Sequence, residues 1–254
     1  MSTAGPAGPP FLCMKCAIMT GMNTSNENRR IGCIFDADGT LLDSMGFWQA
    51  LPRRFLESRQ IAAPADISKV LADMSLPESC AYLHQQYLSE RSAEDIRQEI
   101  TAMIRQAYAE QITLKPGVLT LLSGLQEKGI VMCVASTSDQ LLLEMCFQRL
   151  GIASFFKAVI TPGKENTDKS GPDLYVRSET VMQTAAFNTY VFEDTLLPVR
   201  TAKKAGYRVI AVRDIWSRSD WPLMEETADL CVDGLMERDK IFTFMGANKN
   251  SKEF

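Results

Sequence analysis

Two aspartates, Asp36 and Asp38, follow directly on the apolar run 31–35 in the segment DADGTLLDS. Side chains two residues apart in an extended segment point the same way, so both carboxylates should project from the carboxyl end of a buried strand. Open α/β sheets bind their ligands at that end. Two neighbouring carboxylates repel each other, and a hard divalent cation or a shared proton relieves the repulsion. The pair therefore indicates a site that binds a cation such as Mg²⁺, with an acidic surface turn as the alternative.

Further polar groups stand at or near the ends of other apolar runs. Ser136 ends the run 130–136, Glu193 and Asp194 end the run 189–194, and Lys169 lies in the segment DKSGPDLY. A hydroxyl can donate to a phosphate oxygen, carboxylates can bind a cation, and an ammonium group can offset anionic charge. Taken singly, Ser136 could be an ordinary strand-ending cap and Lys169 a solvated surface residue. Taken in chain order, these groups are expected to converge on one crevice.

The elements that must position these groups alternate between strands and helices. The runs 31–35, 130–136, 189–194 and 207–212 are short, apolar and rich in residues that favour strands. The second and fourth runs follow amphipathic stretches that end in Gly129 and Gly206, which is typical of helix C-termini. This alternation predicts an α/β fold with a doubly wound parallel sheet.

A long stretch after the first strand, residues 46–112, contains no convincing strand pattern. Its best segment, 92–108, begins with Ser92 three residues before an acid and continues with apolar residues at helical spacing. We therefore expect an all-helical cap domain at 46–112, inserted into a core made of 30–45 and 113–240.

The two ends of the chain show weaker patterns. Residues 1–29 lack strand or helix periodicity and are expected to form a flexible leader. A signal peptide is disfavoured because Lys15 breaks the only apolar patch, and Met19 or Met22 could be the true start. Residues 241–254 are expected to form a C-terminal tail.

Composition excludes several classes of protein. The chain has 254 residues, of which 46% are apolar and 23% charged, and its net charge is −4, so we expect no binding to nucleic acid or to a membrane. Its seven cysteines are odd in number and scattered, which favours a reducing cytoplasm over a disulfide framework. Cys33 and Cys133 should be buried in apolar runs. Cys13 and Cys16 form a CxxC, but the sole histidine, His84, does not complete a zinc site.

Four segments, DADGTLLDS, VAST, KSGPD and FEDTLLPVRTAKKAG, resemble the four ordered motifs of the haloacid dehalogenase superfamily. The resemblance covers residues 31 to about 235 and points to the branch with a helical cap inserted after the first motif. It implies a Rossmann-like core, a mobile cap of four-helix type, Mg²⁺ and a covalent aspartyl-phosphate intermediate.

The resemblance also implies a role for each matching residue. Asp36 would be the nucleophile and Asp38 the general acid and base, while Ser136 and Lys169 would bind the phosphoryl group. The implied Mg²⁺ ligands are Asp36, the backbone carbonyl of Asp38, Glu193 and Asp194. The expected activity is hydrolysis of a small phosphorylated metabolite, a phosphomonoester, and the oligomeric state stays open.

Alternatives within and outside the superfamily remain at this point. Asp38 argues against carbon–halogen and phosphonate chemistry, because an acid at that position serves to protonate a leaving oxygen. A sugar-phosphate mutase is the runner-up, although β-phosphoglucomutases carry a His shortly after the first motif where this chain has Trp48. A non-catalytic binding module is the third possibility. Two departures from the motifs are Ser170 in place of a Pro, and Leu196–Pro198, which should thicken a loop beside the site.

Substrate recognition should come from cap residues that face the core. Arg53 and Arg54 could bind a second anionic group of the substrate, with surface solvation as the alternative. Phe47 and Trp48 could stack on a substrate or pack the cap, and His84 is expected to pack the cap or lie at the surface.

Overall fold

The computed structural model describes residues 30–72, 74–162 and 169–246. Its main element is a six-stranded sheet with strand order β5-β4-β1-β6-β7-β8, in which all neighbours are parallel. The strands are β1 (Gly32–Phe35), β4 (Val131–Ala135), β5 (Val159–Ile160), β6 (Thr189–Glu193), β7 (Arg208–Val212) and β8 (Leu230–Val232). The chain builds outward from β1 in one direction through β4 and β5, and in the other through β6 to β8. The predicted doubly wound α/β fold is confirmed, and β1 lies at the topological switch point where such sheets bind ligands.

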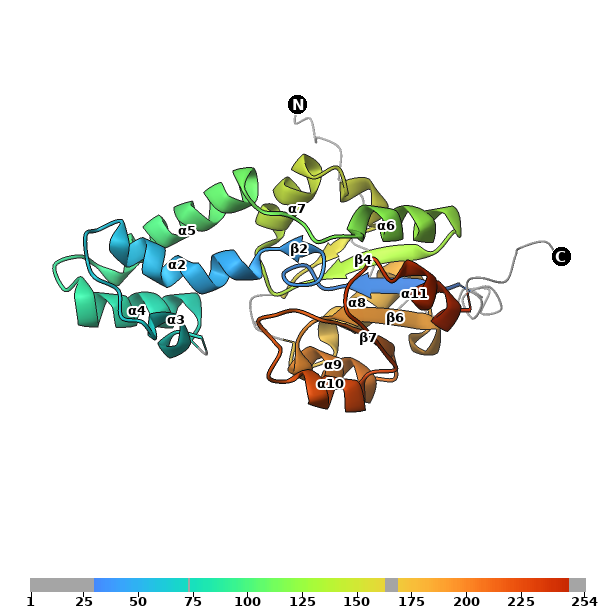
Figure 1. Ribbon diagram of the computed structural model, residues 1–254. Coiled ribbons are helices and arrows are strands. Elements are labelled where there is room, and N and C mark those ends of the chain that lie inside the picture. Colours follow the sequence, from blue (N-terminus) through green and yellow to red (C-terminus); the bar gives the residue numbers. More distant parts are fainter. Residues whose placement is uncertain (1–29, 73, 163–168, 247–254) are drawn as a thin grey trace, which may run out of the picture.

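Helices cover both faces of this sheet (Figure 1). Successive side chains of β1 alternate between the faces, so Cys33 and Phe35 pack into one apolar cluster and Ile34 into the other. The Phe35 face is covered by α6 (Val118–Glu127), α7 (Gln140–Arg149) and α11 (Arg238–Phe244). The Ile34 face is covered by α8 (Asp173–Met182), α9 (Leu196–Lys204) and α10 (Trp221–Thr227).

The inserted segment consists of α2 (Met45–Glu57), α3 (Ile67–Val70), α4 (Leu76–Tyr87) and α5 (Ala93–Glu110). Figure 1 shows these four helices as a group that projects from one end of the sheet. Ser92 caps α5 by accepting the amide of Asp95, as its position in the sequence predicts. Ser75 makes a complete capping box with Glu78 at the start of α4. Pro52 lies inside α2, which continues through it.

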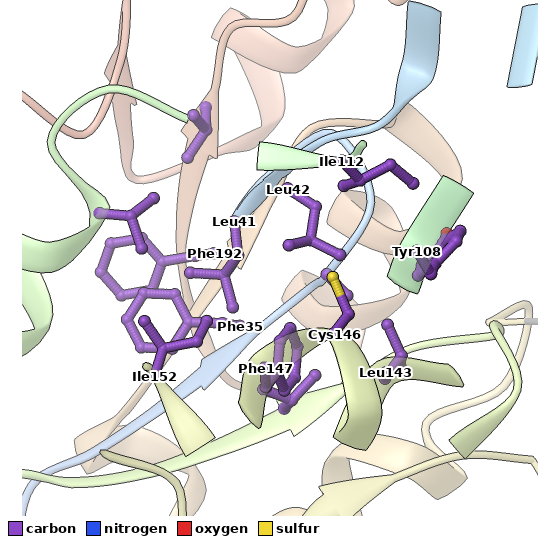
Figure 2. Close-up of a cluster of buried hydrophobic side chains, with 14 of the residues drawn as sticks. Phe35, Leu41, Leu42, Tyr108, Ile112, Leu143, Cys146, Phe147, Ile152 and Phe192 are labelled. Carbon is purple, nitrogen blue, oxygen red and sulfur yellow. The ribbon is translucent and has the colours of Figure 1, made fainter. Parts of the chain in front are cut away.

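The insert joins the core through a small two-stranded sheet and a shared apolar contact. β2 (Leu42–Asp43) pairs antiparallel with β3 (Thr113–Leu114), so the outgoing and returning chains lie side by side. Figure 2 shows Tyr108 of α5 near Leu143 and Cys146 of α7, within the same buried cluster as Phe35. The last cap helix is therefore anchored on the core, close to the carboxyl end of β1.

The C-terminal end differs from the predicted tail that begins at 241. α11 runs through this position to Phe244, and Ile241, Phe242 and Met245 are buried. Burying these side chains against α6 and the sheet gives the segment a structural role that its short apolar pattern did not reveal. The predicted leader, 1–29, lies outside the described residues.

Two predictions about composition can be compared with the structure. Cys33 and Cys133 are buried, as expected, while the CxxC at Cys13 and Cys16 falls outside the described residues. In the described ranges, no helix combines the length and apolar character needed to cross a membrane.

Candidate active site

The parallel sheet brings three strand ends together. The amide of Asp36, the residue after β1, donates to the carbonyl of Phe192 in β6 at 2.9 Å. Phe35 lies in register with Phe192 on one side and with Val134 of β4 on the other. The residues that follow these positions therefore reach the same edge of the sheet.

Three acids meet at this edge. Ligand oxygens of Asp36, Glu193 and Asp194 all lie within 4.8 Å of one another. The ammonium of Lys169 contacts Asp36 Oδ1 and lies 2.6 Å from Glu193 Oε1. Three carboxylates and one ammonium leave two formal negative charges, which a divalent cation would balance. Hard carboxylate oxygens are ligands that suit Mg²⁺.

Burial shapes the protonation of these groups. Burial raises the pKa of Asp36 to about 7, although the charge of Lys169 lowers it. The pKa of Asp194 is also raised, first by burial and then by the charges of Asp36 and Glu193. Burial opposes the charge of Lys169, but the facing carboxylates outweigh that effect and raise the pKa of its ammonium. The single ammonium of Lys169 does not compensate the negative charge of the buried carboxylates, so a bound cation would stabilise their ionised forms.

Hydroxyl groups hold the acids in place. Thr40 Oγ1 donates to Asp194 Oδ1 at 3.2 Å, and Ser217 Oγ donates to the backbone carbonyl of Asp194 at 2.5 Å. The Tyr175 hydroxyl donates to Glu193 Oε1 at 3.0 Å. Each oxygen that accepts such a bond has its orientation fixed, so the acids keep their mutual geometry.

Gly39 permits the close approach between Asp194 and the loop that follows β1. Its φ is +90°, and a Cβ at this position would lie 2.2 Å from Asp194 Oδ2. The Lys115 ammonium donates to the Gly39 carbonyl at 2.6 Å and to Asp214 Oδ2 at 2.7 Å. Lys115, which follows β3 where the chain returns from the cap, therefore holds this loop in place. Only a glycine fits the turn at position 39.

Asp38 lies apart from the acidic trio and contacts both domains. Its Oδ1 accepts bonds from Ser44 Oγ at 2.6 Å and from the Tyr108 hydroxyl at 2.5 Å. Its Oδ2 accepts one from Ser138 Oγ at 2.5 Å. The Asp38 side chain is thus not among the clustered metal-ligand candidates, and the sequence had suggested only its backbone carbonyl for that role.

Ser136 is buried directly after β4 and accepts the amide of Ser138 at 3.2 Å. Sequence reasoning identified Ser136 but missed Ser138, Ser44 and Tyr108. Ser138 carried a signal, because it stands two residues beyond Ser136 in the same strand-end loop. A tyrosine inside an amphipathic helix is typical of a core residue, and Tyr108 is indeed fully buried. Its sequence position gave no sign that its hydroxyl would also bond to Asp38.

These groups open into a cavity of about 1060 Å³ between the core and the cap. Its core wall contains the six predicted site residues together with Thr137, Ser138, Asp139, Leu141, Leu142, Met145, Thr195, Leu197 and Pro198. Its cap wall is formed by Met45, Trp48, Leu76, Arg97, Thr101, Ile104 and Arg105. The six predicted residues are therefore brought together on one wall, facing the insert.

Three other expectations can be compared with the structure. Leu197 and Pro198 border the cavity from the first turn of α9, not from a thickened loop. Arg53 and Arg54 do not line the cavity, and Arg53 donates to backbone carbonyls within the cap. His84 packs in the cap, as expected, with Nδ1 2.6 Å from the carbonyl of Arg91.

Trp48 lines the cavity and also packs the cap. Its indole Nε1 donates to the Tyr108 hydroxyl at 3.1 Å, and its ring lies edge-on to that of Tyr108. Trp48 can therefore pack the cap and contact a substrate from the same position, as the two interpretations of the sequence require.

Comparisons with known proteins agree with this geometry. A sequence model of haloacid dehalogenase-like hydrolases matches residues 33–212. Hexitol phosphatase A of Escherichia coli is 28% identical over 199 residues, which cover 77% of this chain and 87% of that protein. A phosphorylated carbohydrates phosphatase of Thermotoga maritima is 23% identical over 173 residues, covering 68% and 80%.

The fold has close structural counterparts. The crystal structure of a putative beta-phosphoglucomutase from Thermotoga maritima superposes with a TM-score of 0.72 at 22% identity, covering 84% of this chain and 98% of that one. CbbY from Rhodobacter sphaeroides, solved in complex with phosphate, gives a TM-score of 0.66 at 22% identity, covering 82% and 96%. At this identity the likeness concerns the fold, and it agrees with the sheet and insert described above. With the family match spanning most of the sheet and all of the insert, the chain belongs to the haloacid dehalogenase-like hydrolases.

Proposed function

We propose that this protein is a Mg²⁺-dependent phosphatase that hydrolyses a small phosphomonoester through an aspartyl-phosphate intermediate on Asp36. The observation that carries the proposal is the convergence of Asp36, Glu193 and Asp194 within 4.8 Å, with Lys169 against two of them, at the base of a cavity. The class of phosphomonoester hydrolase is further supported by the family match and by the phosphatase names of its relatives.

The donor set fits Mg²⁺. Asp36, Glu193 and Asp194 supply oxygen atoms, and their excess of two negative charges over Lys169 calls for a divalent cation. The backbone carbonyl of Asp38 is the further ligand expected from the motif. When bound, the ion would withdraw charge from the phosphoryl oxygens and hold the phosphoryl group beside Asp36.

In the first half of the reaction, a carboxylate oxygen of Asp36 attacks phosphorus. A bond forms between that oxygen and phosphorus, and the bond from phosphorus to the ester oxygen breaks. Protonated Asp38 gives its proton to the leaving oxygen, a contribution of about 10²- to 10⁴-fold in typical enzymes. Lys169 and Ser136 contact the phosphoryl oxygens and offset their charge.

In the second half, water attacks phosphorus while the carboxylate of Asp38 takes its proton. The bond between Asp36 and phosphorus then breaks, which releases inorganic phosphate and regenerates both aspartates. The hydroxyls of Ser44, Tyr108 and Ser138 donate to the two carboxylate oxygens of Asp38 and fix the orientation of its side chain for this step.

A sugar-phosphate mutase would use the same half-reactions but return the phosphoryl group to a sugar. The position at which β-phosphoglucomutases carry a His holds Trp48 here, whose indole is a donor only and is bonded to Tyr108. Trp48 therefore offers no base to activate a sugar hydroxyl, which favours water as the acceptor.

The proposal is tested with purified protein, p-nitrophenyl phosphate and a panel of sugar phosphates. We expect inorganic phosphate to be released with Mg²⁺ and release to stop with EDTA. A mutase would instead interconvert sugar phosphates with little release of phosphate. Metal-replete protein that turns over no member of the panel would support the binding-module alternative and refute the proposal.

A further inference from the structure

The cap contributes positive charge to the cavity. Arg97, Thr101, Ile104 and Arg105 line the cavity wall from α5. Their spacing of four, seven and eight residues places them on one helical face, the face turned toward the core. Among the cap residues that the structure describes, 45–72 and 74–112, no carboxylate lines the cavity.

The two arginines differ in their partners. Arg97 donates through Nε and Nη2 to Glu94 at 2.7 and 2.6 Å, so its guanidinium is already paired on the helix surface. Within the described part of the chain, Arg105 is exposed and has no hydrogen bond or ion pair to a protein group. Of the two cavity arginines, Arg105 is therefore the one whose charge has no partner among the described residues and is available to a ligand.

The helix geometry also places Arg105 closer to the chemistry. Tyr108, which bonds to Asp38, is three residues further along α5, or about 4.5 Å along the helix axis. Arg97 is eleven residues from Tyr108, or about 16 Å along the same axis. A small molecule with its phosphoryl group at Asp36 can therefore reach Arg105 far more readily than Arg97.

The core wall near the cap carries the carboxylate of Asp139, whose Oδ1 caps α7 by accepting the amide of Leu142 at 3.0 Å. The neighbouring positions Leu142, Met145 and Ile104 are apolar and can contact the carbon skeleton of a substrate.

We propose that Arg105 binds a second anionic group on the leaving part of the substrate. The substrate class is then a small phosphomonoester that carries a further phosphate or carboxylate a few carbon atoms from the scissile ester. A guanidinium matches both groups through paired N–H donors. This inference rests on the proposed function, and it assigns to Arg105 the recognition role that the sequence suggested for Arg53 or Arg54.

The test compares three substrates with the same carbon chain: propyl phosphate, 3-phosphonooxypropanoate and 1,3-propanediol bisphosphate. For the natural protein with Mg²⁺, we expect kcat/KM to be about ten- to a hundredfold higher for at least one substrate with a second anionic group than for propyl phosphate. The carboxylate and the bisphosphate substrates show whether that second group is a carboxylate or a phosphate. In Arg105→Gln the ratio should fall to within about threefold of one, mainly through KM, and Arg105→Lys should restore part of it.

The matched control is Arg54→Gln, an exposed cap arginine that does not line the cavity, which should keep the natural ratio. Equal kcat/KM for all three substrates, or an unchanged ratio in Arg105→Gln, would overturn the inference while the phosphatase proposal stands. If no substrate is hydrolysed, the phosphatase proposal fails.

Calorimetry decides the inference independently of turnover. The bisphosphate should bind the Asp36→Asn protein at least tenfold more tightly than propyl phosphate, and Arg105→Gln should remove that difference. Equal binding of the two ligands would contradict the role of Arg105.

Discussion

The ionic groups of the core and of the cap lie in different surroundings. In the core, the side chain of Lys169 is 5% exposed and faces Asp36 and Glu193, which are 11% and 1% exposed. In the cap, Glu99 lies between Arg59 and Arg91, and the three side chains are 27–34% exposed. Buried charges are costly to desolvate, whereas charges in contact with water cost little. The core thus holds charge where the chemistry requires it, while the cap keeps its charged groups solvated.

The largest effect should come from the attacking carboxylate. Asp36→Asn keeps the shape of the side chain but removes its negative charge, so turnover should fall by about 10⁴-fold or more. Phosphate release from p-nitrophenyl phosphate measures the loss, and circular dichroism checks the fold. Asp43→Asn, an exposed aspartate in β2, is the matched control and should keep its activity. Near-normal turnover by Asp36→Asn would rule out the covalent route.

The second prediction compares the ion pairs of Lys169 in the core with those of Glu99 in the cap. Lys169→Met leaves buried carboxylates without their cation, so the free energy of unfolding without metal should fall by about 3–5 kcal/mol. Glu99→Gln in the cap should cost about 1 kcal/mol or less. Urea unfolding followed by circular dichroism compares the two. Equal costs would show that burial does not distinguish the core from the cap.

A pair of glycines sharpens the same contrast. Gly39→Ala forces a Cβ toward Asp194 at a positive φ, so both activity and the free energy of unfolding should fall, the latter by about 1–3 kcal/mol. Gly46→Ala in the first turn of α2 meets no atom within 4 Å, and should leave the protein unchanged or more stable by up to about 1 kcal/mol. Thermal unfolding and Mg²⁺ titration measure both variants. A Gly39→Ala protein with natural stability and metal affinity would contradict the close packing of this loop.

The smallest effect concerns pH. In the metal-free protein the pKa of Asp36 is about 7, above its ordinary value of 3.8, so the folded state binds a proton more tightly than the unfolded state. Its contribution to stability is therefore fully present below about pH 4 and is lost as the pH rises through 7. Mg²⁺ must displace this proton, so its apparent affinity should weaken by up to about tenfold for each pH unit below 7. Calorimetric titration between pH 5 and 8 tests this, and an affinity independent of pH would contradict it.

The sequence predicted the parts of this protein that depend on local patterns. The four apolar runs became β1, β4, β6 and β7, because a buried parallel strand leaves a continuous apolar signal. The acids at their ends could be identified for the same reason, since polar residues directly after such runs must leave the core together. The edge strands β5 and β8 were not predicted, because strands of two and three residues carry almost no periodicity.

Contacts between distant segments were beyond the reach of these patterns. The bond from Tyr108 to Asp38 joins residues 70 positions apart, and the bond from Ser138 to Asp38 joins residues 100 apart. Nothing in the local sequence of α5 indicates that the hydroxyl of Tyr108, rather than its ring alone, would matter. Likewise, Arg53 and Arg105 both lie on amphipathic helices, and only the packing of the cap on the core decides which one lines the cavity.

The central claim, a phosphoryl group carried by Asp36, can be measured directly. The protein is mixed with substrate and Mg²⁺, quenched in acid within milliseconds, digested and analysed by mass spectrometry. The account predicts a peptide spanning residue 36 that carries one phosphoryl group, loses it to hydroxylamine and is absent from Asp36→Asn. Rapid release of phosphate with no phosphorylated peptide, or with the phosphoryl group on another residue, would contradict it.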